Sequence, residues 1–410
     1  MPNPETPALP AGLARRLAAA RRLARQQNIP LYLVGGAVRD LYLRRPIGDV
    51  DLVVEGDAVA FAQELARDFG AKLALHGRFG TAVVTLPAGG HLDLAGARTE
   101  EYDRPGALPS VQPAPISEDL RRRDFTVNAM ALEVGKAGKP ALLDPFGGRA
   151  DLRRKVVRML HPRSPFDDFT RSLRAVRYAN RLGFAIERQT RAWIRSAAAS
   201  GAADAISGDR LRRELLLVFS EKNRAAAVRE MASLGISRTI HPRLRFDAAV
   251  GRRLRAAERL AAAEGAEATG LVYLLSWMGE ISPEAAVGIA GRLNLPRASA
   301  RAVREWPAFE RRVARAVAKN EDLAPLVEGR DDDSVLAVAA IAPPAARRRI
   351  LAAARAGRET LGIAGRDLVA AGIPAGPAIG RALAATLTAR RRGKIGKEDE
   401  LAFALEAARS

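Results

Sequence analysis

The chain reads LVGGAVRD at residues 33–40 and GDVDLVV at residues 48–54, and these two stretches decide the fold of its first part. An apolar run, a pair of glycines and a short amphipathic segment predict a strand, a tight turn and a helix. The second stretch predicts another strand. Residues two apart on a strand point to the same face, so we expect Asp49 and Asp51 to present their carboxylates side by side.

The same stretches suit the phosphates of a nucleotide and a metal ion. Gly35 and Gly36 allow a phosphate to approach the backbone, next to the unpaired N–H groups of the following helix. Arg39 can add a charged donor to a triphosphate. Two carboxylates held close together are unfavourable unless a cation lies between them, and carboxylate oxygens suit Mg²⁺. We predict that Asp49 and Asp51 are catalytic and bind two Mg²⁺ ions about 4 Å apart; the alternatives are an ordinary tight turn and a solvated acidic turn.

Strand and helix patterns alternate around these motifs. Strands are expected at residues 31–34, 49–54, 72–75, 81–86 and 91–94, and helices at residues 37–43 and 58–69. This order predicts a small mixed β-sheet flanked by helices. Asp93 lies in the last of these strands, where it is either a third carboxylate beside the pair or a polar residue on an edge. The proline-rich segment 104–115 is predicted to be a loop.

Helical patterns dominate the rest of the chain. From residue 166 onward, Ala, Leu and Arg recur at helical spacing, and a further helix is expected near the N-terminus around Leu13, Leu17 and Leu23. We therefore predict an α+β fold, in which an N-terminal head with the mixed sheet is followed by an all-α neck, body and tail. The predicted boundaries are 1–158 for the head, 159–230 for the neck, 231–330 for the body and 331–410 for the tail.

The composition limits the classes of protein that fit. The 410 residues carry a net charge of +20, which favours a polyanionic partner such as nucleic acid, unless an arginine-rich genome raises arginine everywhere. There is no cysteine, which excludes disulfides and thiolate metal sites and fits a cytoplasmic location. No apolar run approaches the about 20 residues that cross a bilayer, so we expect no membrane association. No protein partner is evident.

A polar stripe is expected on the helix that contains DDFTRSLRAVR, residues 167–177. Its members recur every three residues: Asp168, Arg171, Arg174 and Arg177. Cytosine and adenine each carry an amino donor beside a ring-nitrogen acceptor, and a carboxylate next to a guanidinium complements that pattern. Uracil and guanine present the opposite pattern, so Asp168 and Arg171 would leave groups unpaired with them. Arg174 is expected to meet phosphate; the alternative is an ordinary amphipathic helix with a salt bridge.

Taken together, the motifs resemble the class II CCA-adding enzymes and bacterial poly(A) polymerases, which are DNA polymerase β-like nucleotidyltransferases. The matching stretches are LVGGAVRD with GDVDLVV (33–54), EDLRRRDFTVNAMAL (118–132), DPFGGRADL (144–152), DDFTRSLRAVRYANRLGF (167–184) and, more weakly, SGDRLRREL (207–215). The resemblance implies that Arg123, Asp124 and Asn128 hold the sugar of the incoming nucleotide, and that Asp168 and Arg171 select its base. Arg174 and Arg177 complete the predicted nucleotide-binding set.

The resemblance also implies an activity: addition of C and A (CCA) to the 3′ end of tRNA from CTP and ATP, with Mg²⁺ as cofactor. The neck would select the nucleotide and the tail would bind tRNA, and no histidine is expected to act. Some relatives add only CC, only A, or poly(A). Segment 98–119, which is altered or shortened in CC-only relatives, is close to full length here and favours CCA addition. An inactive RNA-binding protein and a small-molecule nucleotidyltransferase are alternatives, which the presence of Asp49 and Asp51 and the charge of +20 respectively disfavour.

Overall fold

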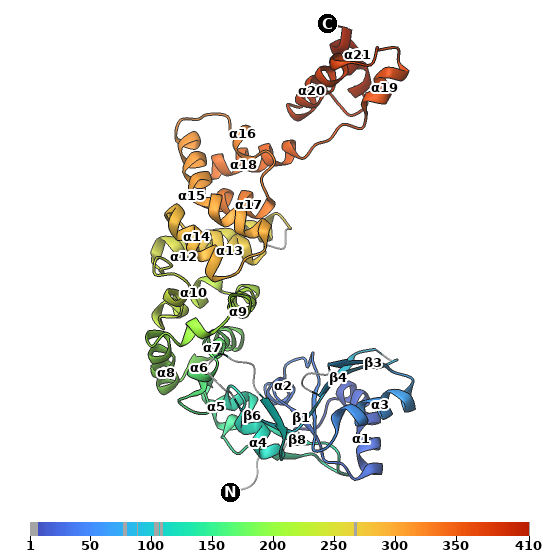
Figure 1. The fold of residues 1–410 in the computed structure, drawn as a ribbon, viewed down its shortest axis with the longest axis vertical. Coiled ribbons are helices and arrows are strands. Elements are labelled where there is room, and N and C mark those ends of the chain that lie inside the picture. The colour runs from blue at the N-terminus through green and yellow to red at the C-terminus, as the bar shows by residue number, and fades with distance from the viewer. Residues whose placement is uncertain are drawn as a thin grey trace. The chain divides into compact units, whose positions relative to one another are not determined.

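The structure is a computed structural model that describes residues 7–76, 80–87, 89–101, 106, 110–265 and 269–409. The chain divides into two compact units, Met1–Arg245 and Phe246–Ser410, which are described separately below (Figure 1). The predicted finer boundaries at residues 158, 230 and 330 stay predictions.

A seven-stranded mixed sheet forms the centre of the first unit, in the order β3-β4-β5-β2-β1-β8-β9. The strands are β1 (Leu31–Val34), β2 (Asp51–Val54), β3 (Lys72–His76), β4 (Thr81–Thr85), β5 (His91–Gly96), β8 (Ala131–Glu133) and β9 (Ala141–Leu143). Strands β2 and β5 run parallel and all other neighbours are antiparallel. The predicted mixed sheet in an α+β head is therefore confirmed.

Helices flank the sheet and continue to the end of the first unit. They are α1 (Ala11–Gln27), α2 (Gly36–Tyr42), α3 (Ala58–Phe69), α4 (Ile116–Arg121), α5 (Gly148–Arg154), α6 (Ser164–Asp167), α7 (Thr170–Leu182), α8 (Arg188–Ala199), α9 (Gly208–Ser220), α10 (Arg224–Ser233) and α11 (Ile236–Ile240), with short 3₁₀ turns η2 (Thr126–Asn128) and η3 (Ala202–Ala205). Helix α3 packs on β4 and β5, and α1 packs on α3 (Figure 1).

Local sequence explains these elements. All four residues of β1 are buried, as expected of a continuous apolar run in the middle of a sheet. The Asp57 side chain caps α3 by accepting from the N–H groups of Val59 and Ala60. On α1, Leu13, Leu17 and Leu23 are buried at helical spacing, so the predicted N-terminal helix packs on the head as expected.

Two local predictions are wrong. Strand β2 begins at Asp51, not at Asp49, because ladder pairing with β1 and β5 covers only Asp51–Val54. The segment 104–115 is not all loop, because β7 (Ser110–Pro113) pairs antiparallel with β6 (Arg98–Glu101) as a separate ribbon. Proline is tolerated on such a two-stranded edge. Residues 102–105 and 107–109 of this segment lie outside the described residues.

The described part of the second unit contains only helices as regular elements. They are α12 (Ala248–Ala263), α13 (Gly270–Met278), α14 (Pro283–Arg292), α15 (Arg297–Ala318), α16 (Ala324–Val327), α17 (Asp332–Ile341), α18 (Pro344–Gly357), α19 (Gly365–Ala370), α20 (Pro377–Arg391) and α21 (Glu400–Arg409). Helix α13 is the most apolar and its Trp277 is fully buried. The last helices share a small core of Leu368, Ile373, Ala382 and Ala404. No helix among the described residues has the length and apolar character needed to cross a membrane.

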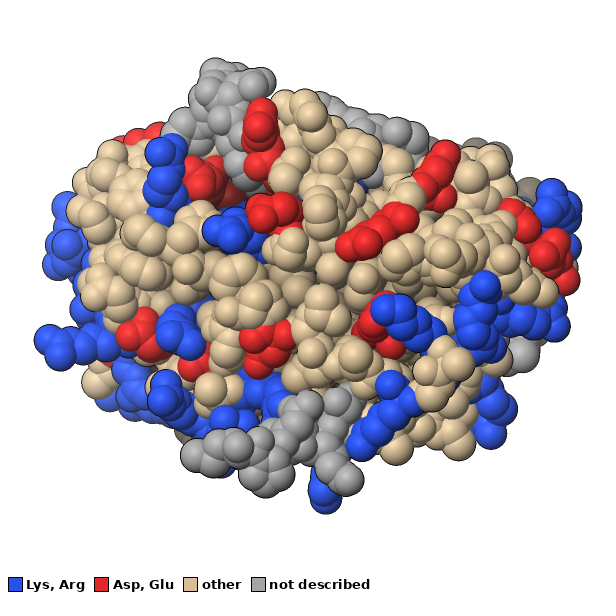
Figure 2. All heavy atoms as spheres, turned by 90° about the horizontal axis from the view of Figure 1, so that it is seen from below, with Lys and Arg blue, Asp and Glu red and all other residues tan. Residues whose placement is uncertain are grey.

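On one face of the molecule, positive and negative side chains are mixed (Figure 2). Figure 2 shows a face on which Lys and Arg lie mainly towards the edges, with Asp and Glu spread between them. The net charge of +20 therefore does not form one continuous basic surface there among the described residues.

Candidate active site

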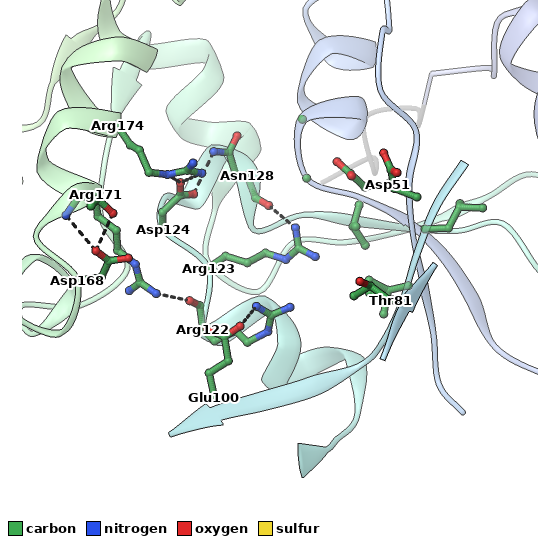
Figure 3. Close-up of a pocket in the computed structure, with 18 of the residues that line it drawn as sticks. Asp51, Thr81, Glu100, Arg122, Arg123, Asp124, Asn128, Asp168, Arg171 and Arg174 are labelled. Carbon is green, nitrogen blue, oxygen red and sulfur yellow. Dashed lines mark hydrogen bonds and ion pairs between the residues drawn. The ribbon is translucent and has the colours of Figure 1, made fainter. Parts of the chain in front are cut away.

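A cavity of about 830 Å³ lies in the first unit between the sheet and α7 and α9. The cavity is lined by nine of the residues predicted from the sequence to form the site: Gly35, Gly36, Asp51, Arg123, Asp124, Asn128, Asp168, Arg171 and Arg174. Figure 3 shows Asp51 on the sheet side, Asp168 and Arg171 on the helical side, and Arg123 between them. This volume suits a small-molecule ligand. Asp49, Arg39 and Arg177, which were also nominated, are not among the lining residues.

Asp51 lies where the glycine turn meets the sheet. A Cβ atom built on Gly35 would lie 3.8 Å from Asp51 Oδ2, and Gly35 has a φ of +67°, which favours glycine. The parallel register of β2 and β5 places Asp93 directly beside Asp51. Asp93 also lines the cavity, so this polar residue is adjacent to the predicted carboxylate pair.

Nearby positive groups offset the negative charge of the sheet carboxylates only in part. Burial raises the pKa of Asp51, and the charges of Asp93 and Asp49 raise it further, while Arg123 and His91 oppose the shift. The imidazole Nε2 of His91 lies 3.6 Å from Asp49 Oδ1 and 3.7 Å from Asp93 Oδ2. Both carboxylates therefore face the same nitrogen, a neighbour that sequence reasoning did not identify.

The carboxylates fit a divalent ion that takes further ligands from its substrate. Among the described residues, no group of three or more His, Cys, Asp or Glu side chains is arranged to hold a metal alone. Mg²⁺ is commonly held by one or two carboxylates together with substrate phosphates and water. The Asp49 side chain is 81% exposed, so it is free to reach such an ion from the loop before β2.

A buried aspartate orients two arginine side chains that line the cavity. Asp119 is fully buried and accepts hydrogen bonds from Arg122 Nη2 at 2.6 Å and Arg123 Nη2 at 2.9 Å. Burial alone would raise the pKa of Asp119, but the two guanidinium groups outweigh it and lower the pKa. Arg123 Nη1 would lie only 3.0 Å from a Cβ atom on Gly35. Glycine at that position therefore leaves room for the guanidinium.

Asp124 is the centre of a second buried network. Arg174 Nη2 donates to Asp124 Oδ2 at 2.6 Å, and Asn128 Nδ2 donates to Oδ1 at 3.0 Å. Burial would raise the pKa of Asp124, but Arg174 and Asn128 lower it below its usual value. Arg39 donates to Asn128 Oδ1 at 2.8 Å and also pairs with Asp40. In this structure Arg39 thus contacts the network behind the cavity, and phosphate binding by Arg39 stays a prediction.

Tyr178, on α7, contacts three guanidinium groups, two of them from the predicted polar stripe and one from the helix after the glycine turn. They belong to Arg39, Arg174 and Arg177, at 5.2, 5.5 and 5.0 Å from the ring centroid. Such contacts hold cations through the negative face of the ring. Arg177 also lies 3.4 Å from Glu214 Oε2. These contacts concentrate positive charge beside a cavity that Tyr178 and Glu214 both line.

The predicted base-selecting residues are both fixed by neighbours. Asp168 Oδ1 accepts from the N–H and hydroxyl of Thr170, and Arg210 Nη2 donates to Asp168 Oδ2 at 2.7 Å. Arg171 Nη1 donates to Ser164 Oγ at 3.0 Å. Sequence reasoning missed Arg210, although the stretch SGDRLRREL that contains it had been noted.

Comparison with known proteins gives a consistent result. The Poly A polymerase head domain matches residues 31–158, and the probable RNA and SrmB-binding site of polymerase A matches residues 183–247. The A-adding tRNA nucleotidyltransferase of Geobacter sulfurreducens is 43% identical over 53% of this chain and 25% of its own length. The chain spans about half or less of the length of the A-adding relatives that it matches.

Two other matches extend over most of both chains. The CC-adding tRNA nucleotidyltransferase of Deinococcus radiodurans is 33% identical over 92% of this chain and 89% of its own length. A structure of the Thermotoga maritima CCA-adding enzyme complexed with tRNA_CCA has a TM-score of 0.77 and 27% identity, over 98% of this chain and 97% of that one. The resemblance inferred from the motifs is confirmed. The chain belongs to the family of tRNA nucleotidyltransferases that carry the poly A polymerase head domain.

Proposed function

We propose that this protein is a template-independent tRNA nucleotidyltransferase that adds C and A (CCA) to the 3′ end of tRNA from CTP and ATP. One observation carries the proposal: a single cavity is lined by Asp51 and Asp93 on the sheet and by Asp168 and Arg171 beside α7. A nucleotide there could bring its phosphates to the carboxylates and its base to the Asp/Arg pair. The tRNA complex of a relative supports tRNA as acceptor. A cytoplasmic location, which the lack of cysteine favours, belongs to the same proposal.

Enzymes of this family use divalent metal ions, and we take Mg²⁺ to be the ion here. Asp49 and Asp51 would hold two such ions, with Asp93 adding negative charge beside them. When bound, the ions would lower the pKa of the attacking hydroxyl and neutralise charge on the leaving pyrophosphate. The raised pKa of Asp51, caused by burial and neighbouring carboxylates, supports this assignment, because a bound cation would stabilise the ionised carboxylate against both.

The residues around the glycine turn would position the triphosphate and the sugar. Gly35 and Gly36 line the cavity next to Asp51 and Arg123, so phosphate could approach the glycine turn there, while the Gly35 N–H itself donates to the Met130 carbonyl oxygen at 3.3 Å. Asp124 and Asn128, which are joined by a hydrogen bond of 3.0 Å, would recognise a ribose 2′-hydroxyl, which distinguishes ribonucleotides from deoxynucleotides.

In the reaction, the 3′-hydroxyl oxygen of tRNA forms a bond to the α-phosphorus of CTP or ATP. The bond from that phosphorus to the bridging oxygen breaks, pyrophosphate leaves and the hydroxyl proton is released. The chain's own contribution is positioning and fixed charge. The Arg123 guanidinium lies beside the glycine turn and its charge acts on Asp51, so it could stabilise negative charge that develops there.

Base selection would follow from the Asp168/Arg171 pair. The carboxylate accepts from the amino group of cytosine or adenine, and the guanidinium donates to the ring nitrogen. Arg210 and Thr170 fix Asp168, and Ser164 fixes Arg171, so the pattern of donors and acceptors is set before the nucleotide binds. A preset pattern discriminates strongly, because UTP and GTP would leave buried polar groups unpaired.

CC addition is the second candidate, because the curated relative that covers 92% of this chain is CC-adding. The length of segment 98–119 favours CCA, and part of that segment lies outside the described residues. Other relatives are A-adding. These outcomes differ in the tRNA ends that are accepted and in the nucleotides that are joined to them.

The test is to offer purified protein three tRNA transcripts, lacking CCA, CA or A, with each nucleoside triphosphate singly and with CTP and ATP together. CCA addition predicts two C residues on the first transcript with CTP alone and a complete end with both. A protein that stops at CC on all three, or extends only the transcript lacking A, supports a partial activity instead. UTP or GTP incorporated as readily as CTP would refute the base-selecting pair.

A further inference from the structure

An arginine outside the matched head-domain model reaches the segments that carry the sheet carboxylates. Helix α1 ends before residue 31, where the matched domain begins, yet Arg16 on this helix spans two of those segments. Its Nη1 donates to the carbonyl oxygen of Gly48 at 3.1 Å, and its Nη2 donates to that of His91 at 2.9 Å. Gly48 immediately precedes Asp49, and His91 lies two residues before Asp93. One guanidinium therefore joins the two acidic segments.

The backbone at Asp49 is not part of the β-sheet ladder, because Asp49 precedes strand β2. Hydrogen bonds to the neighbouring residues hold it instead. On one side of it, the carbonyl oxygen of Val50 accepts from the Asp93 N–H at 3.0 Å. On the other side, the Gly48 carbonyl accepts from Arg16. Asp49 is thus held between a bond to β5 and a bond to α1, although its own side chain is exposed.

The surroundings of Arg16 are shaped to fix its guanidinium. A Cβ atom on Gly90 would lie 3.0 Å from Arg16 Nε and 3.3 Å from Cζ, and Gly90 has a φ of +84°. Leu13 and Leu17, on either side of Arg16 in α1, are buried in the core. The helix is therefore anchored, and glycine at position 90 gives the guanidinium its space.

We infer that Arg16 is a positioning residue, which holds the Asp49 segment against β5 so that Asp49 and Asp51 can share a divalent ion. The inference rests on the proposed function. Arg16 acts through two backbone carbonyls, and its planar fork of donors suits that double contact better than a lysine ammonium does. A positioned ligand set binds its ion more tightly than a mobile one.

The direction of the change in metal affinity distinguishes a positioning role of Arg16 from a purely electrostatic one. Arg16→Ala removes a positive charge near the carboxylates, which by electrostatics alone would strengthen binding of a divalent cation. Loss of positioning weakens binding instead. Arg15→Ala is the matched control, because Arg15 is the exposed neighbour on the same helix and loses the same charge.

The experiment is a titration of the full-length protein with Mn²⁺ alone, in which free Mn²⁺ is measured by electron paramagnetic resonance. We expect Arg16→Ala to bind Mn²⁺ about 10-fold more weakly than wild type, as is usual when a group supporting metal ligands is removed. Arg16→Lys keeps the charge and the aliphatic part of the side chain, so its Mn²⁺ affinity should lie between those of wild type and Arg16→Ala. The Mn²⁺ affinity of Arg15→Ala should match wild type. The Mn²⁺ midpoint of nucleotide addition should shift by the same factor, with the KM for CTP at saturating Mn²⁺ unchanged.

Unchanged or tighter Mn²⁺ binding by Arg16→Ala overturns the inference, as does a lower kcat without a shifted midpoint. Arg16→Lys decides the matter if Arg16→Ala does not fold, and wild-type binding by Arg16→Lys then counts against the inference. Asp51→Asn distinguishes the two proposals. If Asp51→Asn loses Mn²⁺ while the Arg16 variants keep it, only the inference fails. If Asp51→Asn binds Mn²⁺ like wild type, the proposed metal site fails as well.

Discussion

Two sets of aspartates, which line one cavity or hold the arginines that line it, differ in how their charge is balanced. On the sheet, burial and neighbouring carboxylates raise the pKa of Asp51, which lies beside Asp93. In the other set, here called the helical set, guanidinium groups outweigh burial and lower the pKa of Asp119, on α4, and of Asp124. The helical set is paired with arginines of the chain itself, whereas we propose that the sheet set takes a cation from outside. Under the proposed function, the same residue type would therefore serve as scaffold in one region and as an ion site in the other.

The largest expected effect comes from the sheet set. Asp51→Asn keeps the shape of the side chain but removes the charge that would hold the metal ion. We expect kcat for nucleotide addition to fall by about 1000-fold or more, because the metal supplies several kcal/mol of transition-state stabilisation. Single-turnover assays with CTP would measure it. Wild-type activity in a correctly folded Asp51→Asn protein would remove Asp51 from the metal site.

The helical set should instead control stability. Asp119→Ala leaves Arg122 and Arg123 without their buried partner, and we expect the free energy of unfolding to fall by about 3–5 kcal/mol. Urea denaturation followed by circular dichroism would measure this loss.

The adjacent residue provides the control for Asp119. Glu118 pairs with Arg121 at 3.4 Å on the surface, where the two side chains are 42% and 68% exposed. We expect Glu118→Ala to change the free energy of unfolding by less than about 1 kcal/mol. Equal losses in Glu118→Ala and Asp119→Ala would contradict the scaffold role of Asp119.

A smaller effect is expected on base selection. Asp168→Asn keeps the volume of the side chain but replaces one acceptor with a donor. We expect the ratio of kcat/KM for CTP over UTP to fall by about 10- to 100-fold, since one hydrogen bond is reversed in a buried site. Steady-state assays with each nucleotide give the ratio. An unchanged ratio would assign selection to other residues.

The smallest effect is an opposite pH dependence of stability in the two sets. The folded-state pKa of Asp124 is lowered, so the stability it contributes is present above about pH 4 and is lost as the pH falls through the folded-state pKa. The folded-state pKa of Asp51 is raised, so ionised Asp51 costs stability at neutral pH without metal, and that cost disappears as the pH falls through the folded-state pKa towards about 4.

Melting temperatures measured between pH 4 and pH 8 without divalent ions would test these opposite pH dependences. Asp51→Asn should melt slightly above wild type at pH 7, with a gain that shrinks towards pH 4. Asp124→Asn should melt below wild type at pH 7, with a deficit that shrinks only at lower pH. Two variants with the same sign at pH 7 would contradict the distinction between the sets.

Local patterns predicted the elements and motifs that depend on nearby residues. The boundaries of β1 and α3 follow from a buried apolar run and a capped amphipathic segment. The proximity of Gly35 to Asp51 followed from one strand–turn–helix motif next to a second strand. Asp119 was missed although its partners lie three and four residues later, a spacing that the sequence displayed.

Other features could not be predicted, because they join distant parts of the chain. Arg210 reaches Asp168 across 42 positions, and Arg16 reaches His91 across 75. Such contacts depend on how helices pack, and arginines are too frequent in this sequence for composition to single them out. The ribbon of β6 and β7 was missed because prolines obscure an edge-strand pattern.

The most direct measurement is a crystal structure of the protein with Mn²⁺ and a non-hydrolysable CTP analogue, analysed by anomalous scattering. The account predicts a manganese peak about 2 Å from oxygens of Asp49 and Asp51, in contact with the analogue's phosphates and absent from Asp51→Asn crystals. An analogue bound in the cavity with no peak at Asp51, or with its phosphates beside α7 and its base at the sheet, would contradict it.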